Sequence, residues 1–243
     1  PLLAMLITGG VMYFMLEYAR EHGTPNYRPF ARSCYGEKLG GVVAVLYDIC
    51  FLMTMMCAGG LAFSGEGKLL QGFLGVNYWA TAIVTILISA ALCLYGSKLL
   101  AKSSGYLITI LLMVCLIFTL FSYTNVFDVC AETLPVMSVL NRLGMKWLQW
   151  LYVILMTLAV LTSAAGLAHA GNVRFDGLFR FIKNAQLRRF VITAILLGIA
   201  AVGAALGFQA MLQQGTSIVG WAAIPIVVIP AFTIVASKVR KAN

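Results

Sequence analysis

The sequence has few charged residues: only 10% of its 243 residues are Asp, Glu, Lys or Arg, whereas 61% are hydrophobic. Soluble domains carry about 25% charged residues, so a water-soluble fold would leave much apolar surface in contact with water. The apolar residues instead lie in blocks of about 17–25 residues, the length at which a helix crosses the hydrocarbon core of a bilayer. The composition therefore predicts an all-α integral membrane protein.

The motifs of common enzyme classes are missing. The sequence contains no Walker loop, HExxH zinc helix, GxSxG elbow or dinucleotide fingerprint. The two histidines, His22 and His169, are far apart in the chain, and the six cysteines show neither CxxC pairing nor metal-ligand spacing. Carboxylates inside the apolar blocks are few, which leaves few groups for acid–base catalysis. We therefore expect no enzyme activity, no catalytic residues and no cofactor apart from a coupling ion.

Seven apolar blocks are long enough to be membrane spans. No loop between them is long enough to fold as a separate soluble domain, so we predict one polytopic helical bundle over residues 1–243. Five cations mixed with apolar residues predict a further helix over about 174–189 that lies in the membrane interface. The predicted spans are 2–19, 40–63, 78–97, 105–123, 147–170, 190–212 and 218–237.

The basic residues divide unevenly between the two sides of this topology. Of the 17 Lys and Arg residues, 14 lie in loops on one side, and Lys68, Arg142 and Lys146 lie on the other. Cytoplasmic loops are enriched in Lys and Arg, so we expect Asn243 in the cytoplasm and Pro1 outside. These cations form no contiguous basic face, which argues against a nucleic-acid partner. The expected partners are the lipid bilayer, a small polar solute, and a partner helix or a second copy of the chain.

Asp48 lies inside the second predicted span, in the segment VLYDICFLMTMM. A charged side chain at that depth costs at least about 2.5 kcal/mol. Asp48 is therefore either part of an ion or proton pathway, or an interfacial aspartate paired with a nearby cation or hydroxyl group. The sequence leaves both interpretations open.

Thr162 and Ser163 lie in the middle of the predicted span 147–170, and His169 follows near its inner end. Helical spacing places Thr162, Gly166 and His169 on one face. Hydroxyl groups beside small residues permit either close helix packing or cation coordination. Thr162 and Ser163 are therefore candidate sodium ligands, with helix packing as the alternative. His169 is a candidate pathway residue or a histidine of the inner interface.

Small residues and prolines mark the last two predicted spans. Gly203 and Gly207 form a GxxxG pattern in GIAAVGAALGF, which indicates a close helix–helix contact. Pro225 and Pro230, in WAAIPIVVIPAF, remove two backbone hydrogen-bond donors from one span and predict a kink.

Four groups of motifs follow one another along the chain. They are MYFMLEYAREHGTPNYRPF; GEKLGGVVAVLYDICFLMTMMCAGGLAFSG; LYGSKLLAKSSGYLITILL; and ETLPVMSVLNRLG with LYVILMTLAVLTSAAG, followed by GFQAML and VGW. In this order they resemble the YkvI family of bacterial membrane proteins, which belongs to the amino acid/polyamine/cation transporter superfamily with the LeuT-type fold.

The resemblance implies a partial LeuT-type architecture in the cytoplasmic membrane of a bacterium. Members of the family have more spans than the seven predicted here, so we expect this chain to lack the family's first span, before Pro1, and a central pair near 123–130. The family implies a secondary transporter that moves a small polar solute with Na⁺ or H⁺. It places Thr162 and Ser163 on the helix that offers hydroxyl groups to sodium. The alternative is a non-transporting scaffold or sensor subunit derived from a transporter fold.

Overall fold

The computed structural model describes residues 2–23, 27–95, 109–110, 113, 135–142, 144 and 146–242. These described residues are predominantly helical, and no strand occurs among them, which confirms the all-α prediction. Five helices are long and apolar enough to cross a membrane. They are Glu37–Leu74, Tyr78–Tyr95, Lys146–Phe175, Ala185–Leu206 and Phe208–Val239.

The seven predicted spans correspond only in part to these five helices. The predicted span 2–19 is helical as α1 (Leu2–Glu21), but α1 is not among the helices that meet the length and hydropathy requirement. The predicted span 105–123 lies almost entirely outside the described residues. The seven-span topology therefore remains a prediction.

The chain divides into two compact units: Pro1–Cys57 with Gln213–Asn243 form unit 1, and Ala58–Leu212 form unit 2. The 38-residue helix Glu37–Leu74 consists of α3 (Glu37–Thr54), the π-helical turn η1 (Met55–Gly59) and α4 (Gly60–Leu74). The boundary between the units falls within η1.

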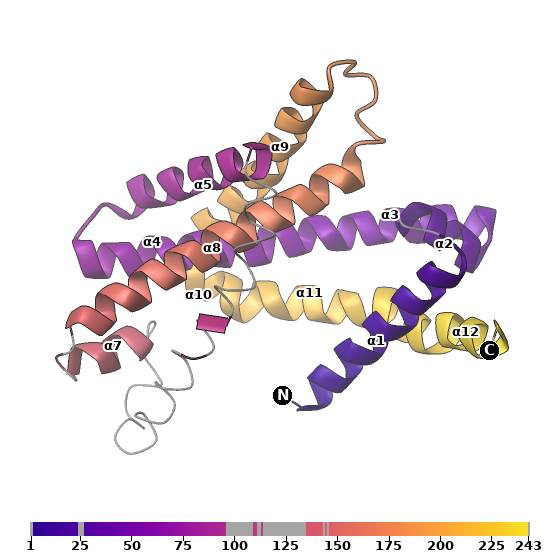
Figure 1. The fold of residues 1–243 in the computed structure, drawn as a ribbon, viewed down its shortest axis with the longest axis horizontal. Helices are drawn as coiled ribbons and strands as arrows, with labels where there is room; N and C mark the ends of the chain where they lie inside the picture. The colour runs from indigo at the N-terminus through magenta and orange to yellow at the C-terminus, as the bar shows by residue number, and fades with distance from the viewer. Residues whose placement is uncertain are drawn as a thin grey trace. The chain divides into compact units, whose positions relative to one another are not determined.

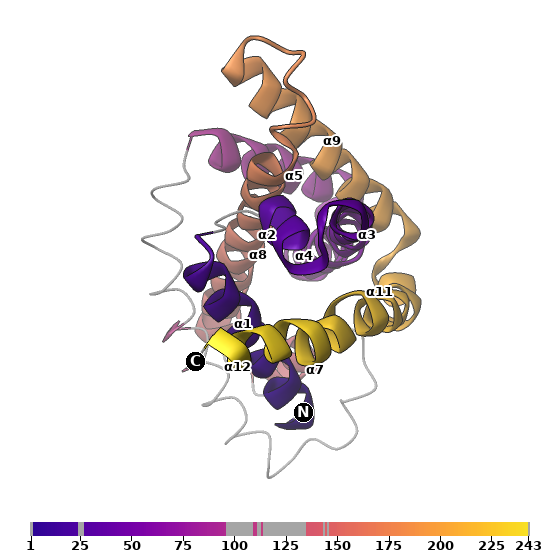
Figure 2. The same ribbon diagram turned by 90° about the vertical axis from the view of Figure 1, so that its right-hand side faces the viewer.

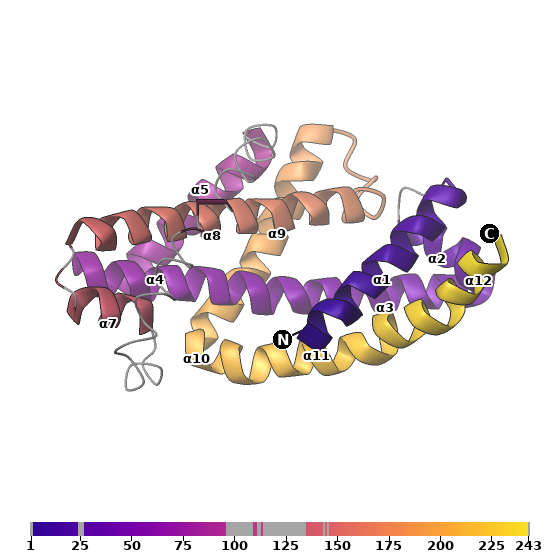
Figure 3. The same ribbon diagram turned by 60° about the horizontal axis from the view of Figure 1, so that its bottom comes forward.

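Unit 1 combines the beginning and the end of the chain. The amphipathic helix α2 (Tyr27–Tyr35) packs against α3, and α1 packs against η5 (Ala231–Val235) and α12 (Ala236–Ala242) (Figures 2 and 3). Phe30 and Cys34 lie four residues apart, so they share the buried face of α2. The core of unit 1 is the cluster Tyr18, Phe30, Cys34, Val235 and Val239.

Unit 2 is built on four packed helices (Figure 1). They are α4, α5 (Tyr78–Tyr95), α8 (Lys146–Phe175) and α9 (Ala185–Leu206). The shorter α7 (Pro135–Arg142) packs on α8, and α10 (Phe208–Ala210) packs on α4. A Cβ atom added to Gly60 would lie only 2.7 Å from the carbonyl carbon of Gly203. Small residues permit such close backbone approach, so α4 and α9 touch through Gly60 and Gly203.

Gly207 separates two helices. The predicted span 190–212 differs from the structure here, because α9 ends at Leu206 and Gly207 has a φ of 93°. Side-chain-bearing residues rarely adopt this left-handed conformation. Gly207 therefore ends α9, and a Cβ atom added to it would meet nothing within 4 Å.

The two prolines lie in the last long helix. This helix continues from α10 through η3 (Met211–Gly215), α11 (Thr216–Ala223) and η4 (Ile224–Val228) to η5 and α12. Pro225 lies within η4, and Pro230 immediately precedes η5. Proline has no N–H and clashes with the carbonyl four residues earlier. At both prolines the structure has a change from α-helical to π-helical turns within a continuous helix.

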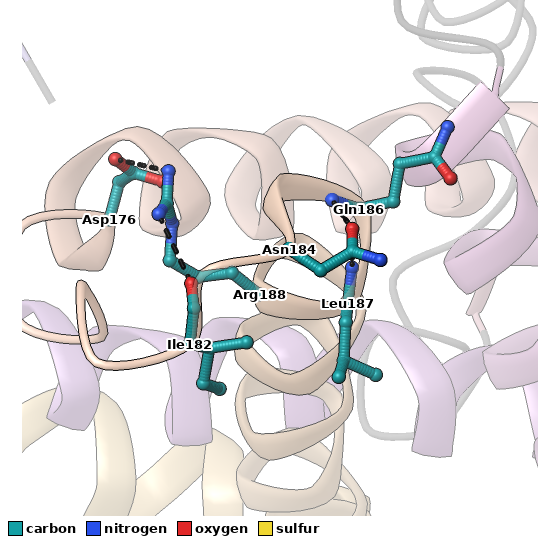
Figure 4. Close-up of polar contacts among 6 residues, drawn as sticks. All are labelled: Asp176, Ile182, Asn184, Gln186, Leu187 and Arg188. Carbon is teal, nitrogen blue, oxygen red and sulfur yellow. Dashed lines mark hydrogen bonds and ion pairs between the residues drawn. The ribbon is translucent and has the colours of Figure 1, made fainter.

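The predicted interfacial helix over 174–189 does not form. Residues 176–181 make turns, and α9 begins at Ala185. The Asn184 side chain accepts hydrogen bonds from the backbone N–H groups of Gln186 and Leu187 (Figure 4). It satisfies donors that a helix start leaves without intrahelical partners, which explains why α9 begins here.

Arg188 holds the same connection together. Its guanidinium group donates to both carboxylate oxygens of Asp176, at 2.6 and 3.1 Å, and to the carbonyl oxygen of Ile182 at 3.4 Å (Figure 4). A bidentate arginine–carboxylate pair of this kind is stronger and more directional than a single hydrogen bond. It ties the end of α8 to the first turn of α9.

Candidate functional site

Glu66 is a carboxyl side chain buried inside unit 2. Two charged side chains are buried in the described part of the chain, Glu66 in α4 and Asp48 in α3, and Glu66 is only 1% exposed. Its helix belongs to a segment long and apolar enough to cross a membrane. An ionisable residue in such a segment is costly and usually serves an ion, proton or substrate pathway.

Thr157 in α8 is the partner of Glu66. Its hydroxyl oxygen lies within hydrogen-bond distance of two oxygen atoms, Glu66 Oε1 at 2.5 Å and the carbonyl oxygen of Val153 in its own helix at 2.9 Å. The second carboxyl oxygen, Oε2, is buried without a hydrogen-bond partner. Burying a polar group without a partner costs free energy, and the cost is larger when the group is charged.

Apolar side chains pack next to this site. A cluster formed by α4, α7 and α8 lies beside it, and the rings of Phe73 and Trp150 meet edge to face with centroids 4.7 Å apart. The Gln149 side chain donates to the carbonyl oxygen of Leu140 at 3.0 Å, which fixes the end of α7 on α8. The cluster comprises Leu69, Met137, Leu140, Tyr152 and Val153.

Lys68 is the cation nearest to Glu66 in the sequence, but it is not the partner of the carboxyl group. Residues two apart on a helix do not face each other. The Lys68 ammonium group lies 5.7 Å from the centroid of the Phe208 ring. The described residues contain no ion pair with Glu66.

A row of polar side chains runs along the buried face of α5. Thr81, Thr85, Ser89 and Cys93 are all buried and recur every four residues, so they share one helical face. The hydroxyl groups of Thr81 and Thr85 donate to carbonyl oxygens one turn earlier in the chain. Ser89 Oγ has no hydrogen-bond partner.

At one end of this row, a polar cluster joins three helices. The Asn172 amide in α8 donates to Thr193 Oγ1 in α9 at 2.7 Å and to Cys93 Sγ in α5 at 3.4 Å. The Asn172 carbonyl oxygen is buried without a partner. Polar contacts of this type hold helices together in an apolar environment.

Asp48 is paired, as one of the two sequence interpretations expects. Its carboxylate accepts hydrogen bonds from the Tyr27 hydroxyl at 2.5 Å and from Arg28 Nη2 at 3.1 Å. Arg28 Nε also donates to the Tyr27 hydroxyl, and this bond is the largest contribution to a raised Arg28 pKa. The three side chains form a polar network that joins α2 to α3 within unit 1.

The candidate sodium ligands do not form a ligand set in the described structure. The Thr162 hydroxyl donates to carbonyl oxygens of Leu158 and Ala159 in its own helix, and Ser163 and His169 are exposed. Among the described residues, no group of three or more His, Cys, Asp or Glu side chains could hold a metal ion.

Glu66 does not stand out in the sequence. Gly65, Gly67 and Lys68 beside it are typical of a loop, so the predicted span ends at residue 63. A signal was present, because apolar residues resume at 69–74 with helical spacing. The four-residue repeat of polar side chains in α5 was also readable from the sequence.

No protein-family model matches this chain, and neither a curated protein nor a solved structure shows detectable similarity to it.

Proposed function

We propose that this protein is a cation-coupled secondary transporter, or a derivative of one, that moves a small polar solute across the cytoplasmic membrane of a bacterium. Glu66 is the observation that carries the proposal. Its carboxyl group is buried at 1% exposure, in a helix with the length and composition of a membrane span. A transporter needs such a group because the coupling cation must bind and leave during each cycle.

A purely structural role explains Glu66 poorly. The neighbouring Phe63 and Leu69 are 0% and 3% exposed, so the surroundings suit an apolar side chain. Burying a polar group without full hydrogen bonding costs free energy, and Glu66 Oε2 has no hydrogen-bond partner. A carboxyl group at this position therefore indicates a task beyond packing.

The solute class and the orientation come from the sequence. The motif resemblance favours the amino acid/polyamine/cation transporter superfamily, whose solutes are small and polar. The excess of Lys and Arg in one set of loops favours a cytoplasmic C-terminus. Buried polar groups on α5, α8 and α9 provide unit 2 with further polar atoms inside an apolar bundle.

The test is transport by the purified protein in proteoliposomes. Solute-induced currents are measured for a panel of L-amino acids and polyamines, each under a sodium gradient and under a proton gradient. We expect a current with at least one solute, and we expect Glu66→Gln to lose most of it. Glu21→Gln is the matched control, because Glu21 is exposed at the end of α1.

Two results contradict the proposal. One is the absence of a current for every solute under both gradients. The other is a Glu66→Gln variant that transports as well as the unmodified protein.

A non-transporting scaffold or sensor subunit is the second candidate, and the state of the sequence-predicted residues favours it. The Thr162 hydroxyl bonds to its own helix and Asp48 is paired with Arg28, so neither offers an open ligand to a cation. In this case the proteoliposomes give no current, and Glu66→Gln changes only the stability of the bundle.

A further inference from the structure

The contacts of Glu66 also bear on which cation the site handles, and this inference rests on the proposed function. A metal ion that leaves water needs several oxygen ligands, because its dehydration is otherwise uncompensated. Thr157 supplies the only hydrogen bond to the Glu66 carboxyl group in the described structure. A proton, in contrast, needs a single oxygen atom.

Thr157 has one hydroxyl proton but two neighbouring acceptor oxygens, and this favours a protonated Glu66. A threonine hydroxyl carries one proton, yet Thr157 Oγ1 lies close to two acceptors, Val153 O at 2.9 Å and Glu66 Oε1 at 2.5 Å. If the hydroxyl proton goes to Val153, as is common for threonine within a helix, then Thr157 Oγ1 can accept a proton from Glu66. Each short contact then contains one hydrogen atom.

The second carboxyl oxygen leads to the same assignment. Oε2 is buried without a hydrogen-bond partner. In an ionised carboxyl group this oxygen would share the negative charge, and a buried charge without a partner is far more costly than a neutral carbonyl oxygen. The neutral form therefore fits the observed surroundings.

No countercharge among the described side chains of the neighbouring helices alters this conclusion. Among the described elements, α5, α8, α9 and α10 pack against α4, and α7 meets Leu69 of α4 in the apolar cluster. None of their titratable side chains forms a hydrogen bond or ion pair with Glu66 in the described structure, and neither does Lys68 of α4 itself. These side chains are Tyr78, Cys93 and Tyr95 on α5, Lys146, Tyr152, His169 and Arg174 on α8, and Arg188 and Arg189 on α9.

We infer that Glu66 is a proton-binding site, neutral in this conformation, and that Thr157 is a positioning residue that holds its carboxyl group. Loading forms an O–H bond between a hydronium proton and a carboxylate oxygen and leaves water. Release is the reverse reaction: the O–H bond at Oε1 breaks and the proton passes to water, which needs a conformation in which water reaches the protonated oxygen, Oε1. The coupling ion at this site is therefore H⁺ and not Na⁺.

Infrared spectroscopy of the purified protein in lipid tests the inference without any solute. We expect a C=O stretching band of a protonated carboxyl group at neutral pH, which shifts slightly in D₂O. The band should be absent from Glu66→Gln and unchanged in Glu21→Gln. Thr157→Val should move the band, because the carboxyl group loses its hydrogen-bond partner, without removing it.

The outcomes separate this inference from the proposed function. If the band is absent from the unmodified protein at neutral pH, or persists in Glu66→Gln, the proton-binding assignment is wrong. Uptake driven by sodium alone, with Glu66 ionised, would support transport but overturn the assignment. A Glu66 band in a protein that moves no solute would support the assignment and contradict the transport proposal.

Discussion

Gly60→Ala is a direct test of the contact between α4 and α9. The added Cβ atom would lie 2.7 and 2.8 Å from the carbonyl carbon and Cα atom of Gly203, and 3.0 Å from the nitrogen of Ala204. Carbon atoms in ordinary contact are about 3.5–4.0 Å apart. All three neighbouring atoms belong to the backbone, so no side-chain rotation can relieve the clash. The two helices must move apart.

The size of the effect follows from a comparison with Gly72→Ala. Gly72 lies in the same helix, is exposed, and has no atom within 4 Å of an added Cβ. Both substitutions gain the same helix propensity, about 1 kcal/mol, which cancels in the comparison. Overpacking a tight contact costs about 1–3 kcal/mol. At about 2–4 °C per kcal/mol, Gly60→Ala should melt about 2–12 °C below Gly72→Ala.

Melting can be followed with a thiol-reactive dye in a background that retains only Cys93. Cys93 is 4% exposed and belongs to the same unit as Gly60 and Gly203, so the dye reports the opening of this unit. Equal melting temperatures for Gly60→Ala and Gly72→Ala would refute the close approach of the two helices.

Three further predictions concern topology, pairing and reactivity. A cysteine placed at Val76 should be labelled from outside intact cells and one at Arg180 only after permeabilisation, and the reverse pattern would contradict the orientation. Arg28→Ala should lower the free energy of unfolding by about 1–3 kcal/mol, because Asp48 loses its charged partner. Arg28→Lys, which keeps the charge, should lower it less. An alanine variant with unchanged stability would contradict the pairing. Burial raises the pKa of the Cys34 thiol, so its maleimide labelling at neutral pH should be slower than that of free cysteine and should accelerate as the pH rises; equally fast labelling contradicts its burial.

The positions of the long helices were predictable from the sequence, but several of their ends were not. Length and hydropathy are local properties, so the apolar blocks located α5 and α8 closely. The long helix past residue 63 was missed because its glycines were interpreted as a loop. A Cβ atom on Gly67 would lie 2.7 Å from the Tyr78 ring, so this glycine is required by packing. At Gly207 the error is in the other direction: the predicted span continues to residue 212, but the helix ends before this glycine. The GxxxG spacing does not distinguish a glycine within a helix from one with a positive φ.

The candidate site was less predictable than the fold. The resemblance directed attention to Thr162 and Ser163, but which way a hydroxyl group points depends on the neighbouring helices. Thr162 bonds to its own backbone and Ser163 is exposed. Composition also favoured Asp48, since it lies deep inside an apolar block, whereas Glu66 lies at the polar end of one.

Asp48 and Glu66 are buried carboxyl groups in one long helix, and their partners differ in a way that decides which can couple ions. Asp48 faces a guanidinium and a phenol hydroxyl, so protonating it would break an ion pair and leave Arg28 without its anionic partner. The described partner of Glu66 is a neutral hydroxyl that can either donate or accept. Protonation of Glu66 therefore reverses one hydrogen bond and breaks no ion pair. When water reaches the protonated oxygen, Oε1, the proton can leave, and Thr157 can then donate to the carboxylate. A carboxyl group that can be neutral or charged with the same neighbours, as proposed for Glu66, meets the requirement of a coupling site. A carboxylate that is paired with a cation, as Asp48 is with Arg28, stabilises the fold instead.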